Sequence, residues 1–343
     1  MGEKVRQSNF ELLRILCMFG VLTSHSLMAM YDLQTANFSF ANEMRVFVMN
    51  ASCLAVNCFV MISGYFQIRQ SWRGFIGLLA PCLFWATVCS SFALFNSECS
   101  VIEAGKNILF PLTETELWFI KAYFALYLIA PLLNAGINHL NDVQLKLACL
   151  MLLVVDVYIG YIHQSSEVTV DGYHIIHFIM LYTIAGMLTE IPIKTLSVGK
   201  LMGGVILCIV LMTLLHMCKM VFPPTAIIYS MRYNSPILFA TSVLIFWLFA
   251  NLKIQNKAIN WVSNSVLAVY LISSLPFFGS CYYRLLVQVN EAYTGVIALL
   301  LVVGIMVFFY IDCILVEHLR KWIMHSLEDK IISFLERRLI VKL

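Results

Sequence analysis

Apolar residues along this chain gather in runs of about twenty, separated by short polar segments. A helix needs about 20 mostly apolar residues to cross the hydrocarbon core of a bilayer. By that criterion about ten segments qualify. They are 10–30, 46–66, 74–95, 118–137, 144–163, 173–190, 200–220, 235–252, 262–281 and 293–316. The pattern therefore predicts an all-α integral membrane protein of about ten transmembrane helices with short connections.

The composition agrees with this pattern. Of the 343 residues, 61% are hydrophobic and 12% are charged, whereas soluble domains carry about 25% charged residues. The net charge is only +3, and we expect no nucleic-acid partner. The eleven cysteines form no Cys-x-x-Cys pair, so neither a zinc site nor a redox motif is indicated.

The placement of Lys and Arg predicts an orientation. With the N-terminus in the cytoplasm, most of the 22 basic residues fall on the cytoplasmic side, as the positive-inside rule requires. Both termini are then cytoplasmic. The first apolar segment contains Glu11 and Arg14 and no small-residue cleavage site, so we interpret it as a retained helix and not a signal peptide.

The C-terminal tail differs from the membrane segments. Trp322, Ile323, Leu327 and Phe334 recur at helical spacing among basic and acidic residues. This arrangement is typical of an amphipathic helix lying on the inner membrane face. We therefore expect a membrane domain at 1–316 and a cytoplasmic amphipathic tail helix at 317–343.

The first apolar segment carries unusual polar residues. Arg14 and His25 are eleven residues apart, which in a helix is a turn of about 1100°, so both lie on one face about 16 Å apart along the axis. Glu11 lies one turn before Arg14. Ionisable residues inside a bilayer are functional candidates. A packed histidine and a snorkelling arginine paired with Glu11 are the alternatives, and spacing alone does not exclude them.

The second segment ends with polar and small residues. Asn57 lies at mid-membrane depth, and Ser63 is followed by a glycine that allows close helix packing. Arg69 and Arg73 follow, four residues apart. On one helix face they could clasp a phosphate-bearing ligand, although two ordinary positive-inside residues would look the same.

The outer ends of later segments hold further candidates. Glu116, Trp118 and Tyr123 open the fourth segment, where aromatic residues form an interfacial belt and would also suit a sugar. Three histidines, His163, His174 and His177, lie near the start of the sixth segment, but a metal site is not expected there because their spacing is generic. Asp156 and Asp312 are intramembrane acids whose partners cannot be identified from the sequence.

Several segments together resemble the membrane acyltransferase-3 family, the polysaccharide and lipid O-acyltransferases of bacterial envelopes. The resemblance covers nearly the whole chain, and it depends on the order and spacing of its motifs. These are Asn9-Phe10-Glu11-Leu12-Leu13-Arg14-Ile15 with His25, Asn57-Cys58-Phe59-Val60-Met61-Ile62-Ser63-Gly64-Tyr65, Leu117-Trp118-Phe119-Ile120 through Tyr127 to Pro131-Leu132-Leu133-Asn134, Tyr233-Asn234-Ser235-Pro236, and Ser265 to Tyr270-Leu271-Ile272.

The resemblance implies a reaction and a location. Acyl-CoA would be the cytoplasmic donor, and a hydroxyl of an envelope glycan or glycolipid precursor would be the acceptor. It implies a multi-pass protein of the bacterial inner (cytoplasmic) membrane, with membrane lipid as its surroundings. We expect an O-acetyltransferase that uses acetyl-CoA, with no bound cofactor and no metal. A transporter or flippase for a lipid-linked glycan is the alternative.

The resemblance also assigns roles to residues. His25 would be the catalytic base or a covalent acyl relay, and Arg14 and Glu11 would act beside it on the donor side. The donor-binding residues would be Arg69, Arg73 and Ser63, and the acceptor-binding residues would be Trp118, Tyr123 and Glu116.

Two departures from the family pattern weaken parts of this assignment. Many members carry Arg-x-x-Arg after the second segment, whereas Arg69 and Arg73 are separated by three residues. Many members also carry a histidine where this chain has Ser273. Chemistry that depends on that histidine does not transfer to this chain.

Overall fold

A computed structural model describes residues 6–33, 39–111, 117–165, 171–190, 197–221 and 232–338. Helices are the only regular elements among these residues, which confirms the all-α prediction. The chain divides into two compact units. Unit 1 comprises Met1–Ile68 and Ala125–Ser263, and unit 2 comprises Arg69–Phe124 and Asn264–Leu343.

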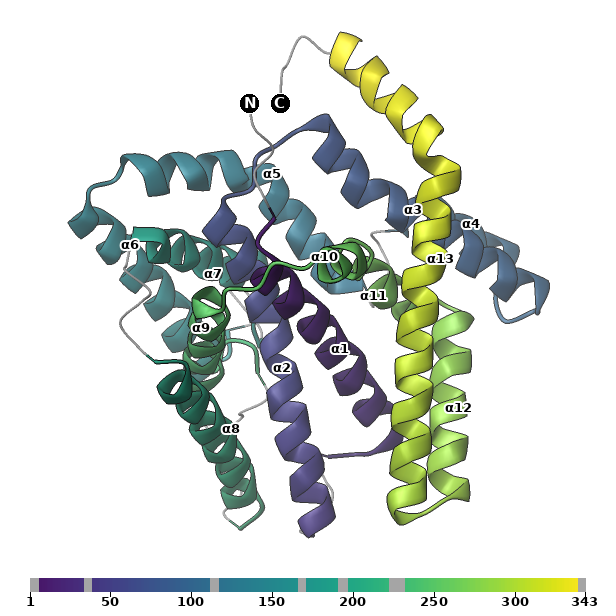
Figure 1. The fold of residues 1–343 in the computed structure, drawn as a ribbon, viewed down its shortest axis with the longest axis horizontal. Coiled ribbons are helices and arrows are strands. Elements are labelled where there is room, and N and C mark those ends of the chain that lie inside the picture. The colour runs from purple at the N-terminus through teal and green to yellow at the C-terminus, as the bar shows by residue number, and fades with distance from the viewer. Residues whose placement is uncertain are drawn as a thin grey trace. The chain divides into compact units, whose positions relative to one another are not determined.

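Unit 1 is built around two long antiparallel helices, α1 (Ser8–Met30) and α2 (Phe40–Phe66) (Figure 1). Close packing at Gly20 sets their approach, because a Cβ there would lie 3.3 Å from the Ser52 carbonyl oxygen. At the other end, the ring of Phe10 lies 5.3 Å from that of Tyr65 and 5.2 Å from that of Phe246. Aromatic rings at such distances attract each other beyond their burial. These contacts fix α1 against its neighbours.

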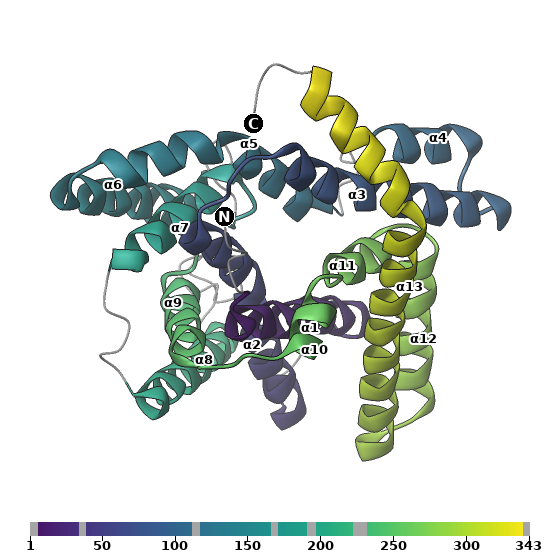
Figure 2. The ribbon, with the colours of Figure 1, turned by 45° about the horizontal axis from the view of Figure 1, so that its top comes forward.

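The remaining helical elements of unit 1 come after α2 in the sequence. They are α5 (Trp118–His139), α6 (Asp142–Val154), η3 (Val155–Ile162), α7 (Ile175–Met187), η4 (Leu188–Glu190), α8 (Val198–Val221), α9 (Pro236–Asn251) and α10 (Lys257–Ser263). Helix α5 begins in unit 2 and continues into unit 1. Helices α8 and α9 lie side by side (Figures 1 and 2).

Two of these helices are shorter than a membrane span. Helix α7 has 13 residues and α9 has 16, although segments 173–190 and 235–252 were predicted to cross. Helix α9 begins with Pro236 at its first position, where the missing N–H of proline costs nothing. The segment η3, which continues α6, is π-helical. Such distortions concentrate at functional positions in proteins.

Unit 2 begins with α3 (Trp72–Phe95) and α4 (Val101–Leu109). The short helix α4 was not predicted. It starts with a capping box, in which Ser100 and Glu103 satisfy each other's backbone N–H groups. Hydrogen bonds from the Ser100 backbone and side chain lower the pKa of the exposed Glu103 carboxyl, since they favour its charged form.

The C-terminal half of unit 2 contains α11 (Leu267–Ser274), α12 (Phe278–Ala292) and α13 (Gly295–Arg338). The helix that ends at Ser274 and the helix that begins at Phe278 meet at 76°, so the predicted segment 262–281 is broken. Helices α12 and α13 run antiparallel side by side (Figures 1 and 2). Helix α13 continues through residue 316 without a break, and its last part bends away from α12 (Figure 1).

Among the described residues, seven helices are long and apolar enough to cross a membrane. The count rises to eight if the bent pair forms one span. The structure therefore supports a multi-pass membrane protein, while the predicted count of about ten is not confirmed. The difference arises at α7 and α9, which have 13 and 16 residues, and at the bend, where the helix breaks inside the predicted segment 262–281.

Candidate functional site

The start of α1 is held in place by side-chain hydrogen bonds to distant backbone. Asn9 Nδ2 donates to the Phe249 carbonyl oxygen at 2.8 Å, and the backbone N–H of Asn256 donates to Ser8 Oγ at 3.0 Å. Both partners lie at or just after the end of α9. These bonds join residues about 240 positions apart in the sequence, so they fix the first turn of α1 against a distant part of the chain.

Glu11 and Arg14 form an ion pair on this anchored turn. Arg14 Nη1 lies 2.8 Å from Glu11 Oε1, and Ser263 Oγ donates to Glu11 Oε2. Glu11 is buried, whereas the Arg14 side chain is 31% exposed. The carboxylate is thus satisfied by two partners, and the guanidinium, with five donors, keeps donors for a ligand. The pairing with Glu11 that belongs to the alternative of a helix-anchoring arginine is thus present, and the donor-side role of Arg14 stays a prediction.

His25 lies on the same helix, eleven residues after Arg14, as the sequence predicted. Its side chain is partly exposed. No hydrogen bond to its imidazole occurs within the described part of the chain. The neighbouring hydroxyls are engaged, since Ser24 donates to the Val21 carbonyl at 2.8 Å and Ser26 to the Leu22 carbonyl at 2.7 Å. The imidazole of His25 thus has no hydrogen-bond partner in the described part of the chain, and its role as a base stays a prediction.

The residues Ser63 and Gly64 at the end of α2 have structural roles. Ser63 Oγ donates to the Phe59 carbonyl oxygen of its own helix at 3.0 Å. A Cβ on Gly64 would lie 2.3 Å from the Tyr182 carbonyl oxygen, so only glycine allows α7 to approach α2 this closely. The assignment of Ser63 to donor binding stays a prediction.

The chain just after α2 is fixed by two side chains of unit 1. The backbone N–H of Ile68 donates to the Tyr182 hydroxyl at 2.8 Å, and Asn134 Nδ2 donates to the Ile68 carbonyl at 2.8 Å. The Tyr182 hydroxyl in turn donates to Asn134 Oδ1 at 2.7 Å. Ile68 immediately precedes Arg69, so this closed triangle of bonds defines where the segment bearing that arginine begins.

Arg69 and Arg73 belong to unit 2 and are both exposed. Arg73 Nη2 lies 3.2 Å from Asp329 Oδ1, and its side chain is 71% exposed. An ion pair at such exposure contributes little to stability. Both arginines thus remain accessible to a phosphate-bearing ligand, and their role in donor binding stays a prediction.

The aromatic residues at the start of α5 form a cluster in unit 2. The ring of Phe119 lies 5.8 Å from that of Tyr123, 6.0 Å from that of Trp118 and 6.1 Å from that of Tyr270. Tyr270 belongs to α11, so two sequence motifs of the predicted family meet here. The acceptor-binding roles of Trp118 and Tyr123 stay predictions, and Glu116 lies outside the described residues.

The structure contains two buried polar clusters that the sequence pattern does not predict. In unit 1, His177 Nδ1 lies 2.8 Å from Asp156 Oδ2, and both side chains are fully buried. In unit 2, Arg320 makes two bonds of 2.9 Å to Glu317, which also accepts from Trp85 Nε1 at 2.7 Å. Asp156 had been noted as an intramembrane acid, but nothing in its spacing from His177 identifies the pair.

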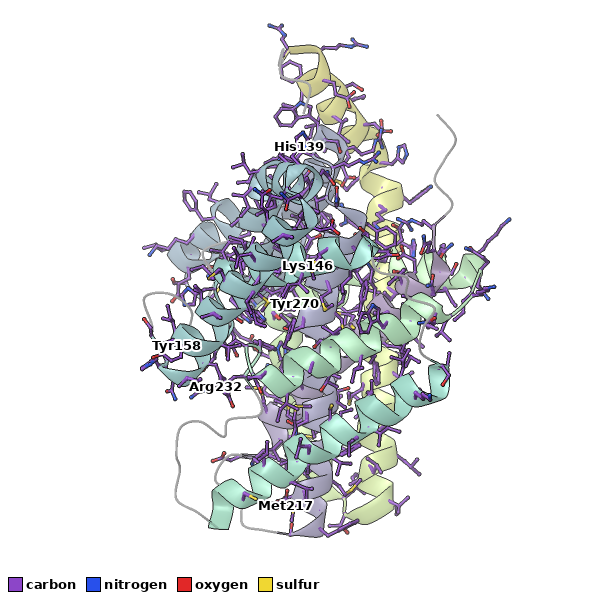
Figure 3. The ribbon with its side chains drawn as sticks, turned by 90° about the vertical axis from the view of Figure 1, so that its left-hand side faces the viewer. His139, Lys146, Tyr158, Met217, Arg232 and Tyr270 are labelled. Atoms are coloured by element: carbon purple, nitrogen blue, oxygen red, sulfur yellow. The ribbon has the colours of Figure 1, made fainter. Side chains whose placement is uncertain are left out.

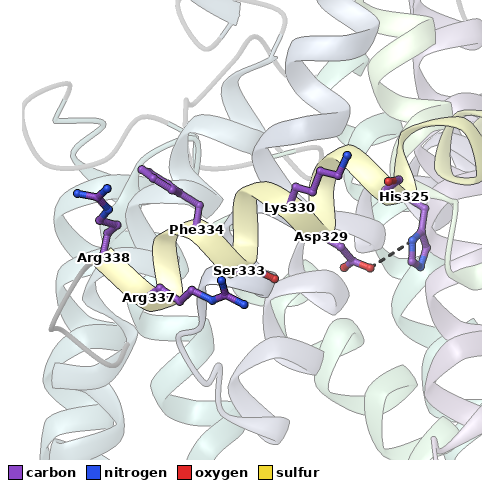
Figure 4. A pocket seen from close by; sticks show the side chains of 8 residues that line it. His325, Asp329, Lys330, Ser333, Phe334, Arg337 and Arg338 are labelled. Atoms are coloured by element: carbon purple, nitrogen blue, oxygen red, sulfur yellow. Dashed lines mark ion pairs between the residues drawn. The ribbon is translucent and has the colours of Figure 1, made fainter.

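A shallow pocket lies along the end of α13 (Figure 4). All the residues that line it belong to this one helix, so it is a polar and basic surface of the helix and not an enclosed cavity. His325 Nδ1 pairs with Asp329 Oδ2 at 3.2 Å, while Lys330, Arg337 and Arg338 add positive charge. On the same part of the helix, Trp322 is 79% exposed. Exposed apolar and basic residues together agree with the predicted interfacial tail.

No group of three or more His, Cys, Asp or Glu side chains suited to a metal ion is found among the described residues. Comparison with known proteins identifies a family model for an acyltransferase domain, Acyl_transf_3, which matches residues 7–318. No curated protein matches the chain. No solved structure matches it either. The match spans nearly every element described above.

Proposed function

The chain belongs to the acyltransferase-3 family of membrane acyltransferases, and from that premise we propose that it is an O-acetyltransferase acting on a surface polysaccharide or a lipid-linked glycan precursor. Acetyl-CoA is the proposed donor, supplied from the cytoplasm. The observation that carries the proposal is the arrangement of α1. Arg14, which is paired with the buried Glu11 and is partly exposed, shares one face of this helix with His25, whose imidazole has no hydrogen-bond partner among the described residues.

The proposed chemistry needs one base and one anion-binding group. The acceptor hydroxyl attacks the thioester carbonyl while His25 takes the hydroxyl proton, and the C–S bond breaks as the ester forms. The proton then passes from the imidazolium to the leaving CoA thiolate, so the histidine returns to its neutral form. A positioned base of this kind contributes about 10²–10⁴-fold in rate.

Arg14 is proposed to bind the donor. Its guanidinium presents a planar fork that suits phosphate or carbonyl oxygens, and Glu11 holds one edge of that fork. The pantetheine arm of CoA is long and flexible, which suits a site where an anion-binding residue and a base lie about 16 Å apart along one helix. Arg69 and Arg73 are proposed to contact the phosphates.

The acceptor site is proposed at the aromatic cluster of unit 2. Phe119, Tyr123 and Trp118 present ring faces at the start of α5, and such faces stack on the apolar face of a sugar ring. The location in the bacterial inner membrane is part of the same proposal and is what the family implies. The cytoplasmic position of both termini follows from the Lys and Arg distribution.

The test compares two variants of His25. His25→Ala removes the imidazole, and His25→Gln keeps polarity and hydrogen bonding but cannot take a proton at neutral pH. We expect both to lose transfer of labelled acetyl from acetyl-CoA to the glycan by at least about 100-fold, with the protein still present in the membrane.

Ser24→Ala is the matched control and should keep transfer, because the Ser24 hydroxyl donates to the Val21 carbonyl oxygen of its own helix. Wild-type transfer by His25→Gln would remove the base from the mechanism. Absence of transfer in the wild type, combined with loss of glycan export in the variants, would favour a transporter.

A further inference from the structure

His177, Asp156 and Asn57 form a chain of hydrogen bonds in the interior of unit 1. His177 Nδ1 lies 2.8 Å from Asp156 Oδ2, and Nε2 lies 3.0 Å from Asn57 Oδ1. All three side chains are 0% exposed. They come from α7, η3 and α2, so the chain joins three elements that are distant in sequence.

The orientation of the Asn57 amide follows from its other partner. Asn57 Nδ2 lies 3.1 Å from the backbone carbonyl oxygen of Tyr233. A carbonyl oxygen only accepts hydrogen bonds, so the amide NH₂ must face Tyr233 and Oδ1 must face the imidazole. Oδ1 is likewise only an acceptor, so His177 Nε2 must carry a proton.

This assignment leaves the second ring nitrogen without a proton if His177 is neutral. A bare Nδ1 and an ionised carboxylate oxygen are both acceptors, and two acceptors do not lie 2.8 Å apart without a proton between them. The pair therefore holds one more proton. It is either imidazolium with carboxylate or imidazole with carboxylic acid, and both forms have zero net charge.

The surroundings of Asp156 favour a pair of zero net charge. Among the described residues, Asp156 Oδ1 has no hydrogen-bond partner, and the same is true of Asn234 Oδ1. Asn234 contacts the cluster through Nδ2, which donates to the Asp156 carbonyl oxygen at 3.4 Å. A carboxylate with an excess negative charge and an unpaired oxygen would be expensive in this interior. The shared proton removes that cost.

The cluster lies where two short helices begin. His177 is in the first turn of α7, and Tyr233 and Asn234 immediately precede α9. Gly172 brings the two approach segments together, since a Cβ there would lie 2.6 Å from Tyr233 Cβ. The same segments share an ion pair of 2.8 Å between Arg232 and Asp171. In Figure 3, Arg232 marks the approach to α9 and Tyr158 marks η3.

We propose that the His177–Asp156 pair, with its one shared proton, is a positioning element for acyl transfer. Through Asn57 and the Tyr233 segment it fixes α2 and α9, the helices against which α1 packs with Arg14 and His25. The link to transfer rests on the proposed function, whereas the proton content of the pair does not. Misplacing α1 would lower the fraction of productive encounters and hence kcat.

Asp156→Asn is the decisive variant. The amide NH₂ replaces the shared proton as donor to His177 Nδ1, and it brings no charge. We expect kcat and thermal stability close to those of the wild type. Asp156→Leu has the same number and branching of side-chain heavy atoms and no charge, but it leaves Nδ1 without a partner. We expect kcat to fall by about tenfold or more, as for an unsatisfied buried group, with little change in the KM for acetyl-CoA.

Asn50→Leu is the matched control. It also removes a buried amide of α2, whose Nδ2 donates to Thr213 Oγ1 at 3.3 Å, but it does not touch the His177 cluster. We expect kcat to stay near the wild-type value even if the thermal stability falls. An equal loss of kcat in Asn50→Leu and Asp156→Leu would overturn the positioning role, because it would indicate general destabilisation of α2.

Nitrogen-15 NMR of histidine-labelled protein in detergent tests the proton itself. We expect the His177 signal, assigned by its loss in His177→Gln, to show a protonated Nε2 and an Nδ1 in a strong hydrogen bond. A bare Nδ1 would overturn the shared proton, as would loss of folding in Asp156→Asn. If the wild type transfers no acetyl group, the proposed function fails while this spectrum still decides the proton content.

Discussion

Each oxygen of the Glu11 carboxylate has its own partner, one the Arg14 guanidinium and the other the Ser263 hydroxyl. The buried carboxylate orients the guanidinium, and the same pairing anchors the first turn of α1, as the alternative of a snorkelling arginine paired with Glu11 also requires. Among the described residues, the imidazole of His25 on the same helix has no hydrogen-bond partner. At the scale of single residues, Arg14 is oriented by its neighbours and His25 is not.

Arg14→Lys tests the donor role at this scale. Lysine keeps the charge but loses the planar fork, so it cannot bond to Glu11 and a ligand in the same geometry. We expect the KM for acetyl-CoA to rise by about tenfold, equivalent to roughly 1.4 kcal/mol of lost binding, while the protein still inserts. The measurement is the rate of transfer against acetyl-CoA concentration, with Lys4→Arg as a control for basic charge near the same terminus. An unchanged concentration dependence would remove Arg14 from the donor site.

At the scale of elements, α2 and α7 approach each other closely at Gly64. The Gly64 position faces the Tyr182 carbonyl oxygen, and Tyr182 also binds Ile68 through its hydroxyl. Close packing therefore accounts for the glycine in the motif Ser63-Gly64.

Gly64→Ala should destabilise the protein, because the added methyl group would meet backbone that cannot rotate away. Overpacking of this kind costs about 1–3 kcal/mol. Gly203→Ala in α8 is the control, since a Cβ there meets nothing within 4 Å, and alanine in a helix interior is about 0.5–1 kcal/mol more favourable than glycine. Thermal unfolding in detergent should show a lower midpoint for the first variant only. Equal midpoints would mean that α2 and α7 are farther apart than described.

At the scale of the whole molecule, the long α13 joins a membrane-length apolar stretch to a polar end. It has 44 residues, or about 66 Å of helix, which is more than twice the thickness of a hydrocarbon core. Part of it must therefore lie outside the core. The buried pair Glu317–Arg320 and the partly exposed Glu328, with bonds of 2.6–2.9 Å, lie where the polar part begins.

Reporter fusions test the predicted topology. The positive-inside rule places Asn141 and Gln255 in the cytoplasm and Gly105 outside. Fusions of a reporter active only in the cytoplasm should give signal at the first two positions and none at the third. The same rule predicts a cytoplasmic signal after Thr195 and none after Glu167, two positions outside the described residues. Signal at Gly105 would contradict the orientation and with it the cytoplasmic entry of the donor.

The sequence by itself determined the helical class, most helix positions and the shared face of Glu11, Arg14 and His25. These properties are local, since apolar runs of membrane length and a repeat of 3.6 residues need only neighbouring residues. The family resemblance was also readable from the order of motifs, and the match over residues 7–318 confirms it.

Tertiary structure alone decided where helices stop inside apolar sequence and which partners the buried polar groups have. The helix breaks between Ser274 and Phe278, inside the predicted segment 262–281, and irregular backbone can lie at membrane depth once surrounding protein satisfies its polar groups. Asp156 is hydrogen-bonded to His177, and His177 is hydrogen-bonded to Asn57, 120 residues away in the sequence. No local pattern encodes such a pairing, because it depends on which helices the packing of the whole unit brings together.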